Sequence, residues 1–291
     1  MTSSSSLGAV AEGRRLTYLS LGAGVQSSAL YVMTTLGLHG CPGADVAIFA
    51  DTQDEPAYVY EQVDRLRAWG VEHHGPRIDT VTAGHLSGDI ISRHRDGKPR
   101  HFAAIPVFSS NGDGGTSMLS RQCASDYKIT PIKRHVRKCL GLRFRQRAKG
   151  KVKAVALIGF SLDEASRMKP SREDWITNVY PLIDARLRRK DCLEIVTAVG
   201  LPAPKKSACV FCPFHDDAYW LWMKTEHPEE FERAANVDEQ IRDMSRSGIA
   251  RPVFVHRSLQ PLRMIDFAER RRLPLFESDQ FQNECEGVCG V

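Results

Sequence analysis

The stretch Leu16–Leu30 constrains the fold most strongly, because it reads as a strand, a loop of small residues and a helix in succession. Leu16–Leu21 contains apolar, β-branched and aromatic residues, which is typical of a buried strand. Gly22–Ser28 follows and leads into an apolar stretch compatible with a helix. Glycines let backbone N–H groups approach an anion, and a helix N-terminus supplies partial positive charge. The stretch predicts a phosphate-binding turn; a strand-to-helix turn capped by serine is the alternative.

The loop differs from the two best-known phosphate motifs, because it lacks the Gly-Lys-Ser/Thr ending and has only two glycines. It resembles the pyrophosphate loop of the adenine-nucleotide α-hydrolase superfamily, usually written Ser-Gly-Gly-x-Asp-Ser. Gly24 and Ser27 match that pattern, whereas Gly22, Ala23 and Gln26 stand in place of serine, glycine and aspartate. The resemblance gives Ser27 a catalytic role and implies a nucleotide held along the loop, by Leu21, Gly22, Ala23, Gly24, Gln26, Ser27 and Ser28.

Length and composition set broad limits on the chain. Its 291 residues with 42% hydrophobic content can bury a full core. We expect a loose tail over residues 1–14, a nucleotide-binding α/β domain over 15–204 and a helical C-terminal region over 205–291. No window of about 18 consecutive apolar residues occurs, so we expect no membrane span and a cytoplasmic protein.

Positive charge is concentrated in one segment of the chain. Lys133–Lys153 contains ten Lys or Arg residues and no Asp or Glu, whereas the net charge of the whole chain is only +5. Charge runs are commonly solvated faces, but a run without acidic residues attracts polyanions. Nucleic-acid contact and a solvated face remain the two interpretations of this segment.

A second buried strand is predicted over Asp45–Ala50. Asp51 and Thr52 follow at its carboxyl end, where open parallel sheets bind ligands. The alternative is an N-terminal cap for a helix over Tyr58–Trp69. The segment also looks like the Asp-Thr-Gly stretch of phosphoadenylyl-sulfate reductases, which implies that Asp51 and Thr52 contact the nucleoside or Mg²⁺.

Three other segments carry simpler expectations. Residues 92–116 are rich in Gly, Arg, Asn and Asp and read as a long loop. Residues 219–246 read as one amphipathic helix with an aromatic stripe, and residues 258–272 read as another helix.

A cysteine and a lysine precede a basic helix that Pro131 opens. Cys123, Lys128, Pro131 and Ile132 resemble a Cys-x(n)-Lys-x-x-Pro-Leu/Ile segment of reductases in the same superfamily. The resemblance implies that Cys123 is an iron ligand, as in cluster-containing members, and that Lys128 neutralises charge during catalysis.

Residues 152–160 form the most strand-like run of the chain and lead into a further motif. Gly159, Asp163, Glu164 and Arg167 resemble the family pattern Gly-x-Arg-x-Asp-Glu-x-x-Arg, with Ser161 at the first arginine. The resemblance places Gly159, Asp163 and Glu164 at the nucleotide and gives Arg167 a catalytic role at a phosphate. A helix start, with its acids near the N-terminal dipole, is equally compatible with these residues.

Eight cysteines in a chain expected to be cytoplasmic indicate metal or sulfur chemistry more than a disulfide framework. Cys209 and Cys212 form a Cys-x-x-Cys-Pro turn, which suits tetrahedral ligation; a redox dithiol is the alternative. Their place in the motif order resembles that of cluster-bearing reductases, which favours a [4Fe-4S] cluster over zinc. Cys285 is assigned as the fourth ligand, and Cys289 is left as the sulfur-handling thiol, with the opposite assignment open.

Together the motifs resemble the adenine-nucleotide α-hydrolase superfamily from about Leu16 to Phe214. The resemblance implies an α/β fold with a doubly wound, mostly parallel sheet and a cysteine-bearing C-terminal extension. It implies an ATP pyrophosphatase of a DNA phosphorothioation system, with ATP, Mg²⁺ and a cluster as cofactors, and DNA, a cysteine desulfurase and other modification subunits as partners. An adenylyl-sulfate reductase, a tRNA thiolase and a non-catalytic nucleic-acid-binding subunit are the alternatives.

Overall fold

A parallel β-sheet forms the centre of the fold. The computed structural model describes residues 15–96, 105–143, 146, 148 and 153–270. Five strands are arranged in the order β3-β2-β1-β6-β7, and all neighbours in this sheet are parallel. Their bounds are β1 (Leu16–Leu21), β2 (Val46–Asp51), β3 (Ile78–Thr82), β6 (Ala154–Leu157) and β7 (Ile176–Val179). The predicted α/β class with a mostly parallel sheet is therefore confirmed.

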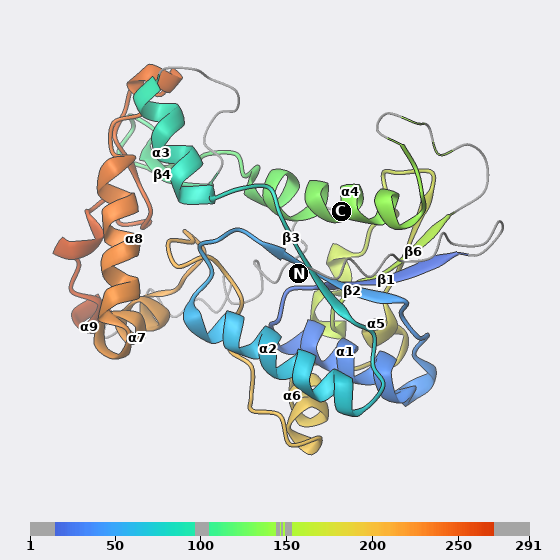
Figure 1. The fold of residues 1–291 in the computed structure, drawn as a ribbon. Coiled ribbons are helices and arrows are strands. Elements are labelled where there is room, and N and C mark those ends of the chain that lie inside the picture. The colour runs from blue at the N-terminus through green and yellow to red at the C-terminus, as the bar shows by residue number, and fades with distance from the viewer. Residues whose placement is uncertain (1–14, 97–104, 144–145, 147, 149–152, 271–291) are drawn as a thin grey trace, which may run out of the picture.

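Helices cover both faces of this sheet (Figure 1). On one face lie α1 (Val25–Leu36), α2 (Ala57–Glu72), α5 (Pro181–Asp184) and α6 (Arg189–Ala198). The other face is crossed by α4 (Thr130–Cys139). Pro131 lies in the first turn of α4, as predicted, where its missing N–H costs no hydrogen bond.

The central strand β1 is largely apolar because it is buried on both faces. Leu19 and Leu21 pack against the α1 side of the sheet, whereas Leu16 and Tyr18 pack on the α4 side. This alternation fixes the register of β1, since a slip by one residue would exchange the two sets of side chains.

The strand order reverses beside β1. The chain runs outward from β1 to β2 and β3, and it later returns to place β6 on the other side of β1. In sheets of this kind, ligands bind outside the carboxyl ends of the strands at this reversal. The loops that follow β1 and β6 both lie there, which directs attention to Gly22–Gly24 and to residues 158–161.

A second core packs beside the sheet domain (Figure 1). It contains a small antiparallel sheet of order β5-β4-β8, formed by β4 (Phe108–Ser110), β5 (Thr116–Met118) and β8 (Val253–Phe254). Its helices are α3 (Leu86–Asp96), α7 (Asp217–Glu226), α8 (Pro228–Gln240) and α9 (Phe267–Arg270). Its residues therefore come from both sides of the predicted boundary at residue 204.

Three predicted segments differ from the structure. Within the described residues, the helix expected over residues 258–272 is only the turn Leu262–Met264 and the short helix α9. The single helix expected over residues 219–246 is two helices, α7 and α8, because Pro228 starts a new helix after His227. The long loop expected over residues 92–116 instead contains the end of α3, the strand β4 and the start of β5. The remaining helical turns are short, namely Leu38–Gly40, Ala124–Ile129, Leu162–Arg167, Ser245–Ser247 and Leu262–Met264.

Candidate active site

The predicted phosphate loop connects β1 to α1 through a sharp backbone turn. Gly24 is the N-cap residue of α1, and the first helical bond runs from the amide of Ser28 to the carbonyl of Gly24, 2.9 Å away. Within the described chain no side chain caps this helix. The backbone amides of its first turn therefore suit an anion.

The backbone at Ala23 takes a conformation that favours glycine, which is the residue at this position in the pattern that the loop resembles. The φ of Ala23 is +61°, in the left-handed region, and its side chain is buried. An L-residue there costs about 1–2 kcal/mol relative to the right-handed region. The surrounding packing must hold this conformation, as is common at functional turns.

The loop that follows β6 lies directly on the start of α1. A Cβ atom added to Gly159 would lie 3.1 Å from both the amide nitrogen and the Cα of Ser27. Any larger residue at position 159 would press on this backbone, so the close approach favours glycine. Gly159 therefore lies against the loop that follows β1.

The two serines of the loop have different surroundings. Ser27 retains 9% of its surface, and its hydroxyl donates to the carbonyl of Gly24 over 3.3 Å. Ser28 is fully buried, and its hydroxyl accepts from Nε2 of Gln62 over 3.4 Å. Ser27 is thus the serine that can face a ligand, while Ser28 ties α1 to α2.

Residues after β2 form the next part of the site. Oδ1 of Asp51 accepts hydrogen bonds from the amide of Gln53 (2.7 Å) and the hydroxyl of Tyr60 (2.9 Å). Thr52 is buried, and its Oγ1 lies 3.4 Å from Oε1 of Glu55 and 3.3 Å from the sulfur of Cys209. Thr52 therefore connects the carboxyl end of β2 with the Cys-x-x-Cys segment.

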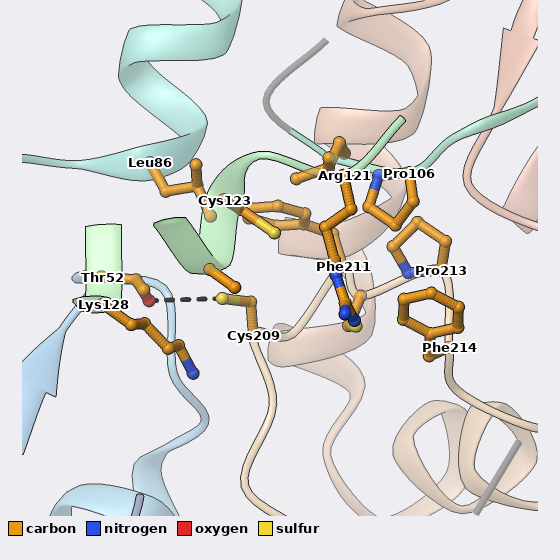
Figure 2. Close-up of a pocket in the computed structure, with 13 residues that line it drawn as sticks. Thr52, Leu86, Pro106, Arg121, Cys123, Lys128, Cys209, Phe211, Pro213 and Phe214 are labelled. Atoms are coloured by element: carbon orange, nitrogen blue, oxygen red, sulfur yellow. Dashed lines mark hydrogen bonds between the residues drawn. The ribbon is translucent and has the colours of Figure 1, made fainter. Parts of the chain in front are cut away.

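Three of the predicted ligand cysteines meet in one pocket between the sheet domain and the second core. Cys123, Cys209 and Cys212 line this pocket, together with Thr52 and Lys128. Figure 2 shows the thiols of Cys123 and Cys209 facing this space from different chain segments. The cysteines come from the start of the turn Ala124–Ile129 and from the segment before α7. Residues far apart in sequence thus line the same pocket.

A buried ion pair borders these thiols. Nζ of Lys128 lies 3.0 Å from Oε1 of Glu55, and the two side chains are 12% and 0% exposed. Oε2 of Glu55 is buried without a hydrogen-bond partner among the described residues. Burial raises the pKa of the Cys209 thiol well above its usual value; the charge of Glu55 adds to this shift and that of Lys128 opposes it.

The donor set fits a metal or cluster in chemistry, since three cysteines line one pocket. Their positions are not those of a formed site, because no group of three or more His, Cys, Asp or Glu residues in the described chain is arranged to hold a metal ion. The remaining assigned thiols, Cys285 and Cys289, lie outside the described residues.

The predicted motif after β6 forms a connected polar network. Glu164 is buried and pairs with Arg167, whose guanidinium lies 4.4 Å from the ring centre of Phe160. Oδ2 of Asp163 accepts from the backbone amide of Arg189, 2.7 Å away, at the start of α6. Asp163 thus binds the N-terminus of α6. Arg167 forms an ion pair with Glu164, which in turn contacts Gln26 in the loop Gly22–Ser28.

Two residues at this site were not assigned from the sequence. Glu55 is the carboxylate that holds Lys128, and Arg189 donates to Gln26 in the phosphate loop over 2.9 Å. Glu55 lies in the acidic stretch after β2, which was a usable signal. Arg189 lies within a cluster of basic residues that carried no signal for this contact.

The basic run is partly neutralised by acids from elsewhere in the chain. Lys133 pairs with Glu173 at 3.0 Å, and His135 contacts Asp79 at 2.8 Å. The run contains no acidic residue of its own, but acidic residues from other segments contact it in the folded protein. Arg134 and Lys138 remain exposed on α4.

Comparison of the sequence with models of known protein families and with curated proteins found no match. Within the described residues, none of the helices combines the length and apolar character that crossing a bilayer requires.

Proposed function

We propose that this protein is an ATP pyrophosphatase that activates a nucleic-acid phosphate by adenylation, so that sulfur can replace an oxygen in DNA phosphorothioation. The observation that carries the proposal is the position of the loop Gly22–Ser28. It follows the central strand, opens α1 and lies where the strand order reverses. This is the place at which open α/β sheets bind phosphate-bearing ligands.

In the first step, an oxygen of the acceptor phosphate attacks the α-phosphorus of ATP, and the bond to the β-phosphate oxygen breaks. Pyrophosphate leaves, and AMP remains bound to the acceptor. The amides of the α1 first turn and the hydroxyl of Ser27 would bind the departing pyrophosphate. Lys128 and Arg167 would neutralise negative charge that develops in the transition state.

In the second step, a hydrosulfide equivalent from a cysteine desulfurase attacks the acceptor phosphorus, and AMP leaves. A cluster, or zinc as the alternative, would be held by Cys123, Cys209, Cys212 and Cys285, and would supply sulfur-transfer chemistry when bound. Asp51 and Thr52 would contact the nucleoside or Mg²⁺. Cys289 would handle sulfur.

The acceptor is inferred from charge. Arg134 and Lys138 lie exposed on α4, the outer layer of one sheet face. Exposed cations attract a phosphate backbone regardless of its sequence. Binding through such contacts weakens with increasing salt, which gives the inferred contact with DNA a direct test.

The full chain, purified anaerobically, should be incubated with ATP labelled at the α- or γ-phosphate, with and without duplex DNA. We expect pyrophosphate release that DNA increases, with AMP joined to the DNA until a hydrosulfide donor is supplied. ADP and orthophosphate, or no turnover together with tight DNA binding, would contradict the proposal. Parallel reactions identify the alternatives: sulfite release from adenylyl sulfate indicates a reductase, and stimulation by tRNA alone indicates a thiolase.

A further inference from the structure

Gln26 lies in the first turn of α1 with both ends of its side-chain amide engaged. It is 1% exposed. Its Nε2 donates to Oε2 of Glu164 over 3.2 Å, and its Oε1 accepts from Nη1 of Arg189 over 2.9 Å. Because one contact requires a donor and the other an acceptor, the amide has a single orientation.

Arg189 reaches this amide from a fixed position. It is the first residue of α6, and its backbone amide is held by Asp163. On the other side of Gln26, Glu164 also binds Arg167. Arg189, Gln26, Glu164 and Arg167 therefore form one chain of contacts across α6, the phosphate loop and the turn after β6.

The chemistry of these four contacting side chains indicates more than a structural link. The bond from Arg189 orients the amide of Gln26, and Gln26 belongs to the first turn of α1. The N-terminus of α1 carries partial positive charge. A polyphosphate at the loop would be attracted by this N-terminus.

We infer that Arg189 is a positioning residue of the phosphate loop, which acts through Gln26 to hold the first turn of α1 in the geometry that binds the polyphosphate tail of a nucleoside triphosphate. This inference rests on the proposed function. In this arrangement the guanidinium orients the Gln26 amide, and Gln26 in turn holds the backbone amides that face the anion.

The test measures binding of inorganic pyrophosphate by calorimetry and the KM for ATP in the full chain. We expect Arg189→Ala to weaken pyrophosphate binding and raise KM about 10-fold, with kcat changed less than about 2-fold, because the lost interaction serves binding. Lys190→Ala is the matched control, since that side chain is 84% exposed and lies one residue away. A purely structural link would lower the melting temperature without this selective change in KM.

A double-mutant cycle tests whether Arg189 acts through Gln26. We expect Arg189→Ala/Gln26→Ala to bind pyrophosphate no more weakly than the weaker single variant, since the two residues serve one contact. Additive losses, or unchanged binding in Arg189→Ala, would overturn the inference while leaving the proposed function intact. Failure of the wild-type chain to bind pyrophosphate would overturn both. If Arg189→Ala does not fold, Arg189→Lys carries the same test, because lysine keeps the charge and loses the guanidinium fork.

Discussion

Lys128 and Glu55 form an ion pair of 3.0 Å whose carboxylate is fully buried. The pair joins the loop after β2 to the turn before α4, and it borders the pocket lined by Cys123 and Cys209. Lys128 is therefore held at the junction of the two parts of the candidate site. Glu55 offsets the cost of burying the Lys128 charge at this junction.

Removing Lys128 alone should lower the unfolding free energy more than removing both Lys128 and Glu55. Lys128→Met leaves Glu55 buried without its cation, and we expect a loss of about 3–5 kcal/mol in unfolding free energy. Lys128→Met/Glu55→Gln should recover a large part of this loss. Urea denaturation of the single and double variants measures both values. Equal stability of the two variants would show that the pair is not energetically coupled.

Gly159→Ala should disturb the phosphate loop specifically. The new methyl group would lie 3.1 Å from backbone atoms of Ser27, which cannot move aside as a side-chain end could. We expect pyrophosphate release from ATP to fall about 10-fold or more, since catalytic contacts depend on sub-ångström geometry. Gly43→Ala is the control, because nothing lies within 4 Å of a Cβ atom there. Normal turnover by Gly159→Ala would mean that the loop is not in contact with the reacting groups.

Ser27→Ala tests the hydroxyl that remains at the surface of the loop. We expect ATP turnover to fall about 10-fold or more, as for the loss of one anion contact in a preorganised site. Ser28 provides a contrast, because its hydroxyl contacts Gln62 in the core. Ser28→Ala should mainly lower the melting temperature, with little change in turnover. A Ser27→Ala variant with full turnover would exclude this hydroxyl from the reaction.

The sequence predicted the parallel sheet and the strand-loop-helix segment at its centre because these features depend on local patterns. A buried strand, small residues and an apolar helix follow one another in β1 and α1, and their physical signatures are contiguous. The break between α7 and α8 was missed, although Pro228 marks it in the sequence.

The environments of single side chains were not readable in the same way. The contact between Arg189 and Gln26, and the pair formed by Lys133 and Glu173, join distant segments whose approach depends on the folded sheet. The basic run therefore seemed unpaired from its own residues, although acids from β3 and from the segment before β7 reach it. Tertiary packing determines such contacts, and a local charge pattern carries no information about that packing.

The thiol pocket predicts which cysteines bind iron. An anaerobic preparation should be brown and contain iron and acid-labile sulfide. Single replacements of Cys123, Cys209 or Cys212 by alanine should each lower the iron content, because a cluster needs its thiolate ligands. Cys192→Ala is the control, since that residue belongs to α6 and its thiol is buried in the other core. Stoichiometric zinc without iron would establish the alternative metal, and iron retained in all three variants would exclude these ligands.

A buried histidine in the second core predicts how stability depends on pH. Nε2 of His256 lies 2.8 Å from Oδ1 of Asp217. Oδ2 of the same carboxylate contacts Arg270 and Arg257. Burial lowers the pKa of His256 below its ordinary value, although Asp217 opposes the shift. The unfolded chain therefore binds a proton at higher pH than the folded chain does, so unfolding free energy should fall as pH decreases below about 6.5.

His256→Gln isolates this contribution from that of the other histidines. We expect the variant to be less stable at pH 8 by about 1–3 kcal/mol, because Asp217 loses a buried partner. We also expect the difference between wild type and variant to shrink from pH 7.5 to pH 5.5, as urea denaturation at each pH would show. A difference that grows as pH falls would mean that His256 gains a proton on folding, and that the ion pair with Asp217 outweighs burial.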